Sequence, residues 1–113
     1  MKIKNYKFGS MTIGNITYHN DLIIFPNKIK SNWWRNEGHN LQMEDIQEVL
    51  SFKPEVLVIG TGKFGLMKVD NNMVKTLDEQ GIKLIVEKTS KAVEKFNAIQ
   101  EEASTVAAFH LTC

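Results

Sequence analysis

The strongest constraint on the fold of this chain is a run of four apolar residues at positions 56–59. These residues do not alternate with polar ones, so the strand they predict is covered on both faces, as at the centre of an α/β sheet. Residues 82–86, which are apolar except for Lys83, predict the next buried strand after a segment with helical spacing. Because strands joined through a helix run parallel in a right-handed crossover, we expect these two strands to be parallel neighbours.

The remaining segments complete an α/β pattern. Residues 2–25 alternate between apolar and polar positions and predict two or three antiparallel strands, most clearly at 15–19 and 21–25. Helical spacing predicts helices near 43–50, near 72–80 and from Thr89 or Ser90 onwards, with one of these two residues as its cap. Residues 105–111 are apolar on both faces and predict a last buried strand. Residues 26–40 are polar and predict a long loop, a kind of segment that is often functional.

Length and charge narrow the class of protein. A chain of 113 residues is the size of one domain, and we expect residues 1–113 to form it. Fourteen basic and thirteen acidic residues are interspersed, so we expect neither nucleic acid nor a membrane as partner. No apolar run could span a bilayer, and the first residues lack the apolar region of a signal peptide. The single cysteine, Cys113, cannot form an internal disulfide, and we expect a cytoplasmic protein.

A glycine motif follows the first buried strand. Gly60, Gly62 and Gly65 have the G-x-G-x-x-G spacing of dinucleotide-binding proteins, and Glu87 ends the next strand where an acid could bind a ribose. In such proteins the helix begins at the glycines, so that its first amides meet the pyrophosphate. Here the helix signal begins only at positions 70–72. We therefore favour a structural turn and expect no nucleotide cofactor.

A weaker ligand hypothesis for the same turn stays open. The amides of Gly60, Thr61, Gly62 and Lys63 could form a nest for a small anion, with the Lys63 ammonium as its counter-charge. Lys63 and Glu87 also follow adjacent parallel strands, at the edge where such sheets bind ligands. The plainer interpretation of these two residues is an ion pair at the surface.

The polar stretch at 26–40 carries both tryptophans of the chain. If Trp33, Trp34 and Arg35 are extended, one ring faces the core and the other faces outwards. An exposed Trp beside an Arg is typical of an interface anchor. The alternative, which we favour, is that both rings cover a sheet edge, with Arg35 stacked or paired nearby.

Metal and catalytic sites are not indicated. On a regular strand His110 and Cys113 would point to opposite faces, because they are three positions apart. His39 and His19 have no partner at the spacing of a metal site, so we expect no metal. No nucleophile–base–acid arrangement can be assembled from the sequence.

Several short elements together resemble the small Mth-type domain family. Five segments carry the resemblance, in this order: Trp34-Arg35…Gly38-His39, Leu57-Val-Ile-Gly-Thr-Gly62, Gly81-Ile82, Thr89…Ala92-Val-Glu-Lys-Phe-Asn97 and Ala107-Ala-Phe-His-Leu-Thr-Cys113. The family includes the mammalian adipogenesis-associated Mth-domain protein and a mitochondrial assembly factor for respiratory complex I. The resemblance implies a three-layer α/β fold with a mixed central sheet, in which the last strand lies inside the sheet, antiparallel to the others. It also implies a role in assembly or regulation, with no established catalytic residues.

Two departures from the family pattern concern possible anion contacts. Members often carry a Gly-Arg pair after the last helix, where this chain has Ala103 and Ser104. Some relatives also lack the equivalents of Gly62 and Gly65, which further weakens the nucleotide-binding hypothesis. We therefore expect a non-enzymatic binding or assembly module with a protein partner or a second copy of itself. The alternative is a protein, or an enzyme, that binds a small anion or small molecule at the Gly60–Lys63 turn with Arg35, His39 and Glu87.

Overall fold

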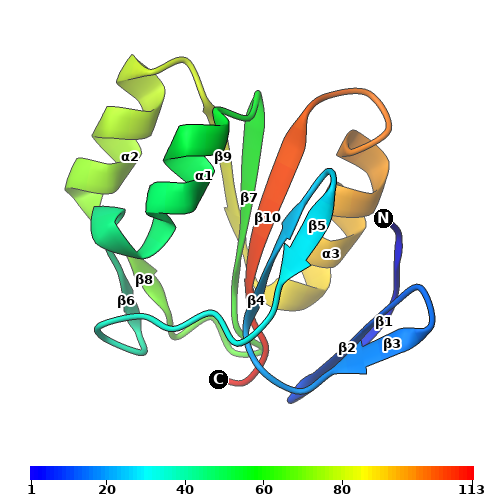
Figure 1. Cartoon of the computed structure of the whole chain (residues 1–113). Helices are drawn as coiled ribbons and strands as arrows, with labels where there is room; N and C mark the ends of the chain where they lie inside the picture. Colours follow the sequence, from blue (N-terminus) through cyan, green and yellow to red (C-terminus); the bar gives the residue numbers. More distant parts are fainter.

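The computed structural model describes all residues, 1–113, and has a five-stranded mixed sheet between helices as its centre (Figure 1). The strand order is β5-β4-β10-β7-β9, and a separate antiparallel sheet β1-β2-β3 lies beside it. The elements are β1 (Ile3–Lys7), β2 (Ser10–Ile13), β3 (Ile16–Tyr18), β4 (Leu22–Phe25), β5 (Lys28–Lys30), β6 (Asn40–Leu41), η1 (Met43–Ile46), α1 (Gln47–Phe52), β7 (Val56–Thr61), β8 (Lys68–Val69), α2 (Asn71–Glu79), β9 (Lys83–Glu87), α3 (Thr89–Ile99) and β10 (Thr105–His110).

The α/β class, the layers and the parallel pair predicted from the apolar runs are confirmed. β7 and β9 pair in parallel, with Val58 opposite Ile85. The prediction that the second of these strands is buried was wrong, because β9 lies at the edge of the sheet and none of its residues is buried. β10 lies inside the sheet as expected, and all six of its residues are buried. Its predicted direction was wrong, however, because it is antiparallel only to β4 and runs parallel to β7. The helix α3 carries the chain back along the sheet after β9, so β10 starts again from the same end as β7.

The predicted long loop at 26–40 is interrupted by a strand. β5 pairs antiparallel with β4, and Ile29 lies opposite Ile24 at the edge of the main sheet. Lys28 and Lys30 flank the single apolar residue, so the strand reads as polar in the sequence. A short strand with lysines is typical of a protected sheet edge, which explains both its position and its weak signal.

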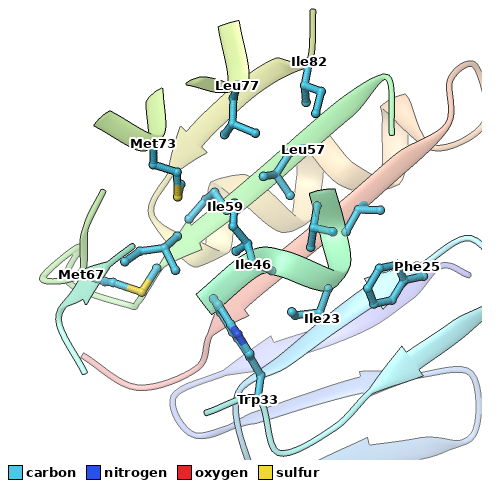
Figure 2. Packing of buried hydrophobic residues seen from close by; sticks show 14 residues of the cluster. Ile23, Phe25, Trp33, Ile46, Leu57, Ile59, Met67, Met73, Leu77 and Ile82 are labelled. Carbon is cyan, nitrogen blue, oxygen red and sulfur yellow. The ribbon is translucent and has the colours of Figure 1, made fainter. Parts of the chain in front are cut away.

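The alternation of side chains along the central strands divides the core into two halves. On the side of α1 and α2, the residues labelled in Figure 2 pack together: Ile23, Phe25, Trp33, Ile46, Leu57, Ile59, Met67, Met73, Leu77 and Ile82. On the side of α3, the strand residues of opposite parity pack against Ala92 and Phe96 and against Ile3 and Met11 of the small sheet. A sheet covered on both faces in this way requires the uninterrupted apolar runs seen in the sequence.

The ends of the helices partly match the sequence signals. Asp70 is the residue that precedes α2, where the helix signal begins in the sequence, although its side chain makes no capping hydrogen bond, and Gly81 follows the helix with φ +75°. The prediction for α3 was wrong, because Lys88 occupies the capping position and Thr89 is the first helical residue. The Thr89 side chain is fully buried and bonds to two strand ends instead of capping the helix.

Candidate functional site

The strand directions bring several polar residues together at one edge of the sheet. β7 and β10 are parallel, so Thr61 and His110 lie opposite each other at their ends. β4 is antiparallel to β10, so the residue before its start, Asp21, reaches the same edge. The carboxyl ends of parallel strands are the usual ligand side of such sheets, which makes this edge the candidate site.

A largely buried charged cluster occupies the edge. Oδ2 of Asp21 accepts hydrogen bonds from Nδ1 of His110 at 2.7 Å and from Nη1 of Arg35 at 2.8 Å, and Oδ1 accepts one from the amide of Leu111 at 2.7 Å. Burial raises the pKa of Asp21, but the hydrogen bonds from His110, Leu111 and Arg35 together outweigh it, and the pKa lies below its ordinary value. The carboxylate is thus held ionised as the centre of the cluster.

The ionised acceptor determines which nitrogen of His110 carries a proton. Nδ1 donates to Asp21, so the 3.2 Å approach of Arg35 Nη2 to the same nitrogen joins two donors and is not a hydrogen bond. Arg35 Nη2 donates instead to the carbonyl oxygen of Gly38 at 2.9 Å. Two buried nitrogens have no partner, Nε of Arg35 and Nε2 of His110. The Arg35 guanidinium lies 4.8 Å from the centre of a Trp33 ring, and this cation–π contact offsets part of the cost of burying it.

The glycines of the motif allow close approach to neighbouring atoms. A Cβ on Gly60 would lie 2.6 Å from Phe109 and 2.9 Å from the Thr89 hydroxyl. A Cβ on Gly62, where φ is +102°, would lie 2.6 Å from backbone atoms of Cys113 and 2.8 Å from Cδ2 of His110. The glycines therefore have a structural role, because a side chain at Gly60 or Gly62 would collide with neighbouring residues. The helix that follows the motif, α2, starts only at Asn71.

The amides of the glycine turn are largely engaged within the protein. The amide of Gly62 donates to the Thr89 hydroxyl at 2.8 Å, and that hydroxyl donates to the carbonyl oxygen of His110 at 2.7 Å. The amide of Lys63 donates to the carbonyl oxygen of Thr112 at 2.7 Å. These two amides are consequently unavailable for an anion nest, which leaves the Lys63 side chain as the remaining attraction for an anion at the turn.

The acid at the end of β9 does not join the cluster. The carboxylate of Glu87 forms an ion pair with Lys95 of α3, so the predicted surface pair with Lys63 is wrong. The hydrogen bond from Lys95 lowers the pKa of Glu87 below its ordinary value. The backbone carbonyl of Glu87 does contact the site, since it accepts a hydrogen bond from the Thr61 hydroxyl at 3.1 Å.

The side chain of His39 lies near both the buried His110 and Cys113. The rings of His39 and His110 meet edge to face with their centres 5.6 Å apart, and Sγ of Cys113 lies 3.9 Å from Nε2 of His39. His110 and Cys113 were predicted to lie on opposite faces of a strand, but β10 ends at His110 and Cys113 lies beyond it. No group of three His, Cys, Asp or Glu side chains is arranged to hold a metal ion.

The two tryptophans have opposite environments. Trp33 is 4% exposed, and its indole N–H donates to the carbonyl oxygen of Asp45 at 2.9 Å. Trp34 is 75% exposed and borders a shallow hollow lined by His19, Asn20, Asn32 and Thr112. The alternation expected for an extended segment is confirmed, whereas the idea that both rings cover a sheet edge is wrong for Trp34.

Comparison with known proteins identifies a family for this chain and solved structures with the same fold. A family model described as a protein of unknown function (DUF498/DUF598) matches residues 3–111. The chain belongs to this family. A solved structure of a Mth938-like domain from Bordetella pertussis matches the DUF498 domain with 17% identity and a TM-score of 0.69, covering 97% of this chain and 85% of that one. The resemblance to the Mth-type family is thus confirmed.

Other solved structures align over nearly the whole DUF498 domain. A conserved hypothetical protein from Pyrococcus horikoshii OT3 has 23% identity and a TM-score of 0.85, with 100% of both chains covered. A protein described as an outer membrane protein from Bartonella henselae has 27% identity and a TM-score of 0.82, with 98% of this chain and 94% of that chain covered. None of the helices of the present DUF498 domain has the length and apolar character needed to cross a membrane.

In this DUF498 domain, Asp21 was not selected from the sequence, and His110 was considered only as a metal ligand with Cys113. Asp21 stands directly before the apolar strand β4, and His110 is the one ionisable residue in the buried strand β10. A charge next to a fully buried strand is costly unless it is paired, so the position of Asp21 is the signal in the sequence that indicates a buried partner. The sequence separation of 89 residues gave no reason to pair them with each other.

Proposed function

We propose that this DUF498 domain is a non-enzymatic protein-binding module that holds its partner at Trp34. The observation that carries the proposal is the environment of this indole, which is 75% exposed although both neighbouring residues are buried. An exposed tryptophan contributes most to binding when a partner covers it, and Trp is among the residues that dominate interface energetics.

The neighbours of Trp34 fix its backbone. The amide of Trp33 donates to the carbonyl oxygen of Asp21 at 2.8 Å, and the indole N–H of Trp33 donates to Asp45. On the other side, Arg35 is bound to Asp21 and to the carbonyl of Gly38. Because the segment is held on both sides of Trp34, little backbone entropy remains to be lost on binding, and a preorganised anchor binds more tightly.

The surroundings of Trp34 suit a protein contact. The adjacent hollow offers polar side chains of His19, Asn20 and Asn32 beside the apolar ring. An apolar anchor with a polar rim is the common anatomy of a protein interface. The Asp21 cluster then has a positioning role, because it holds the segment that presents the ring.

The experiment compares Trp34→Ala with Val74→Ala, an exposed apolar residue of α2 that serves as the control. Sedimentation at high concentration tests self-association, and quantitative capture from the native host tests a heterologous partner. We expect Trp34→Ala to weaken whichever association the wild type shows by about 2 kcal/mol or more, with Val74→Ala unchanged. Association that is equally strong in Trp34→Ala and the wild type would refute the proposal.

A second candidate function is the binding of a small anion beside Lys63. The observation that favours it is the unpartnered Nε of Arg35, a buried N–H donor in the cluster with His110, whose ring lies against the exposed ring of His39. A titration with phosphate and with sulfate, followed by NMR of the histidine rings, tests this candidate. We expect saturable shifts of His39 and His110 that are lost in Lys63→Ala. Absence of shifts at tens of millimolar anion would exclude the site.

A further inference from the structure

Three large apolar side chains are exposed on two neighbouring loops beside the candidate site. Phe8, Phe64 and Leu66 are 51%, 59% and 47% exposed. The rings of Phe8 and Phe64 come from the β1–β2 turn and the β7–β8 loop, and their centres are 6.3 Å apart. Both segments are tied to the end of the chain, since the amide of Gly9 donates to Leu111 and that of Leu66 donates to Cys113.

Three lysines adjoin these apolar residues. Lys63 directly precedes Phe64 in the chain. Lys68 and Leu66 are both exposed, and the residue between these two, Met67, is buried. The Lys88 stem lies over the loop, with Cγ 3.3 Å from the position that a Cβ on Gly65 would take. We call these six residues, Phe8, Phe64, Leu66, Lys63, Lys68 and Lys88, the basic-apolar surface.

The three lysines of this surface have no carboxylate partner, unlike the lysines that form ion pairs elsewhere in the chain. Lys28 and Lys30 both pair with Glu48, and Lys95 pairs with Glu87. None of Lys63, Lys68 and Lys88 has a carboxylate or terminal oxygen within 4.0 Å. Exposed apolar side chains next to unpaired cations leave both kinds of complementarity to a binding partner.

We infer that the basic-apolar surface binds an acidic amphipathic segment of a partner protein. Apolar side chains along one stripe of the segment would cover Phe8, Phe64 and Leu66, and its carboxylates would meet the lysines at the rim. The inference rests on the proposed protein-binding function but uses none of the residues around Trp34. It therefore specifies the chemistry of a partner that the Trp34 surface leaves open.

Two other occupants fit the surface less well. A second copy in a symmetric dimer would bring the same three lysines together around the symmetry axis, where like charges repel. A membrane surface needs side chains that project several ångströms into the acyl boundary. The rings of Phe8 and Phe64 are instead about half covered and pack against each other, so they do not project far from the surface.

The test uses two labelled synthetic peptides with identical Leu and Phe positions in a helical heptad pattern. The remaining charged positions are Glu in one peptide and Lys in the other, and binding is measured by fluorescence anisotropy. We expect the Glu peptide to bind and the Lys peptide not to bind, with affinity falling as salt is added. The double variant Lys63→Glu/Lys88→Glu and the variant Phe64→Ser should each weaken the Glu peptide by about tenfold or more.

Matched controls separate this inference from the function proposed at Trp34. Lys75→Glu changes an exposed lysine of α2 that has no ion pair, and Trp34→Ala removes the other surface, so both should bind the Glu peptide like the wild type. Thermal melts establish that each variant is folded. The inference is overturned if the Glu peptide does not bind at millimolar concentration, binds no better than the Lys peptide, or binds the double variant undiminished. Binding to phosphatidylserine vesicles, in place of the Glu peptide, through the same residues would also overturn it.

Discussion

Nδ1 of His110 lies 2.7 Å from Oδ2 of Asp21, although the two residues are 89 positions apart in the chain. The bond joins the last residue of the central strand β10 to the residue before β4. Arg35 donates to the same carboxylate oxygen, so the 31–39 segment is attached at the point where the two strands meet. The anchoring of Trp34 and the closure of the sheet edge thus depend on one carboxylate.

Replacing that carboxylate should destabilise the protein strongly. Asp21→Asn places an amide where Arg35 and His110 need an acceptor and leaves a buried guanidinium without its counter-charge. We expect a loss of about 3 kcal/mol or more in the free energy of unfolding. Chemical denaturation measures the loss, and Asp78→Asn on the exposed face of α2 is the control, with no change expected beyond about 0.5 kcal/mol. Equal stability of the two variants would show that the cluster contributes nothing.

Acid should unfold the protein partly through the same carboxylate. The pKa of Asp21 is lower in the folded state than its ordinary value of 3.8, because hydrogen bonds from His110, Leu111 and Arg35 outweigh the effect of burial. A lowered pKa contributes stability that is complete above the unfolded pKa and is lost as the pH falls through the folded pKa. We expect the free energy of unfolding to fall below about pH 4. In Asp21→Asn the decrease over this range should be smaller, and parallel curves for the two proteins would contradict the assignment.

Gly62 should tolerate no side chain. In Gly62→Ala the methyl group would meet Cys113 and His110 at less than 3 Å, at a φ of +102°. The strained backbone and the overpacking together should cost about 2–5 kcal/mol. Gly38→Ala is the matched control, because a Cβ there meets nothing within 4 Å and its φ is not positive. Thermal or chemical unfolding of both variants tests the expectation, which fails if Gly62→Ala is as stable as Gly38→Ala.

The two tryptophans should separate in stability measurements. Trp33 is 4% exposed and makes a hydrogen bond to Asp45, so Trp33→Ala should cost about 3–5 kcal/mol. Trp34→Ala removes a ring that is 75% exposed and should change stability by no more than about 0.5 kcal/mol. Denaturation curves of the two variants provide the comparison. A large loss in Trp34→Ala would mean that this ring packs on the domain in solution and is not presented for binding.

The candidate site was only partly predictable. The turn at Gly60 and Gly62 and the residues Arg35 and His39 were selected from the sequence, and the structure places them at one edge with Asp21 and His110. Glu87 was also selected, but its carboxylate turns to Lys95. The difference arises because the sequence shows where a strand ends, whereas the partner of a charged side chain depends on which helix packs beside that end.

The sequence by itself determined the local structure of this protein. The apolar runs in β7 and β10 specify strands buried on both faces, and helical spacing specifies α2 and α3, because burial and backbone geometry act over a few neighbouring residues. Only the tertiary structure decided that β10 runs parallel to β7 and that Arg35 and His110 both bind the carboxylate of Asp21. Strand order and direction depend on the packing of the whole chain, and no pattern within a short window records a contact across 89 residues.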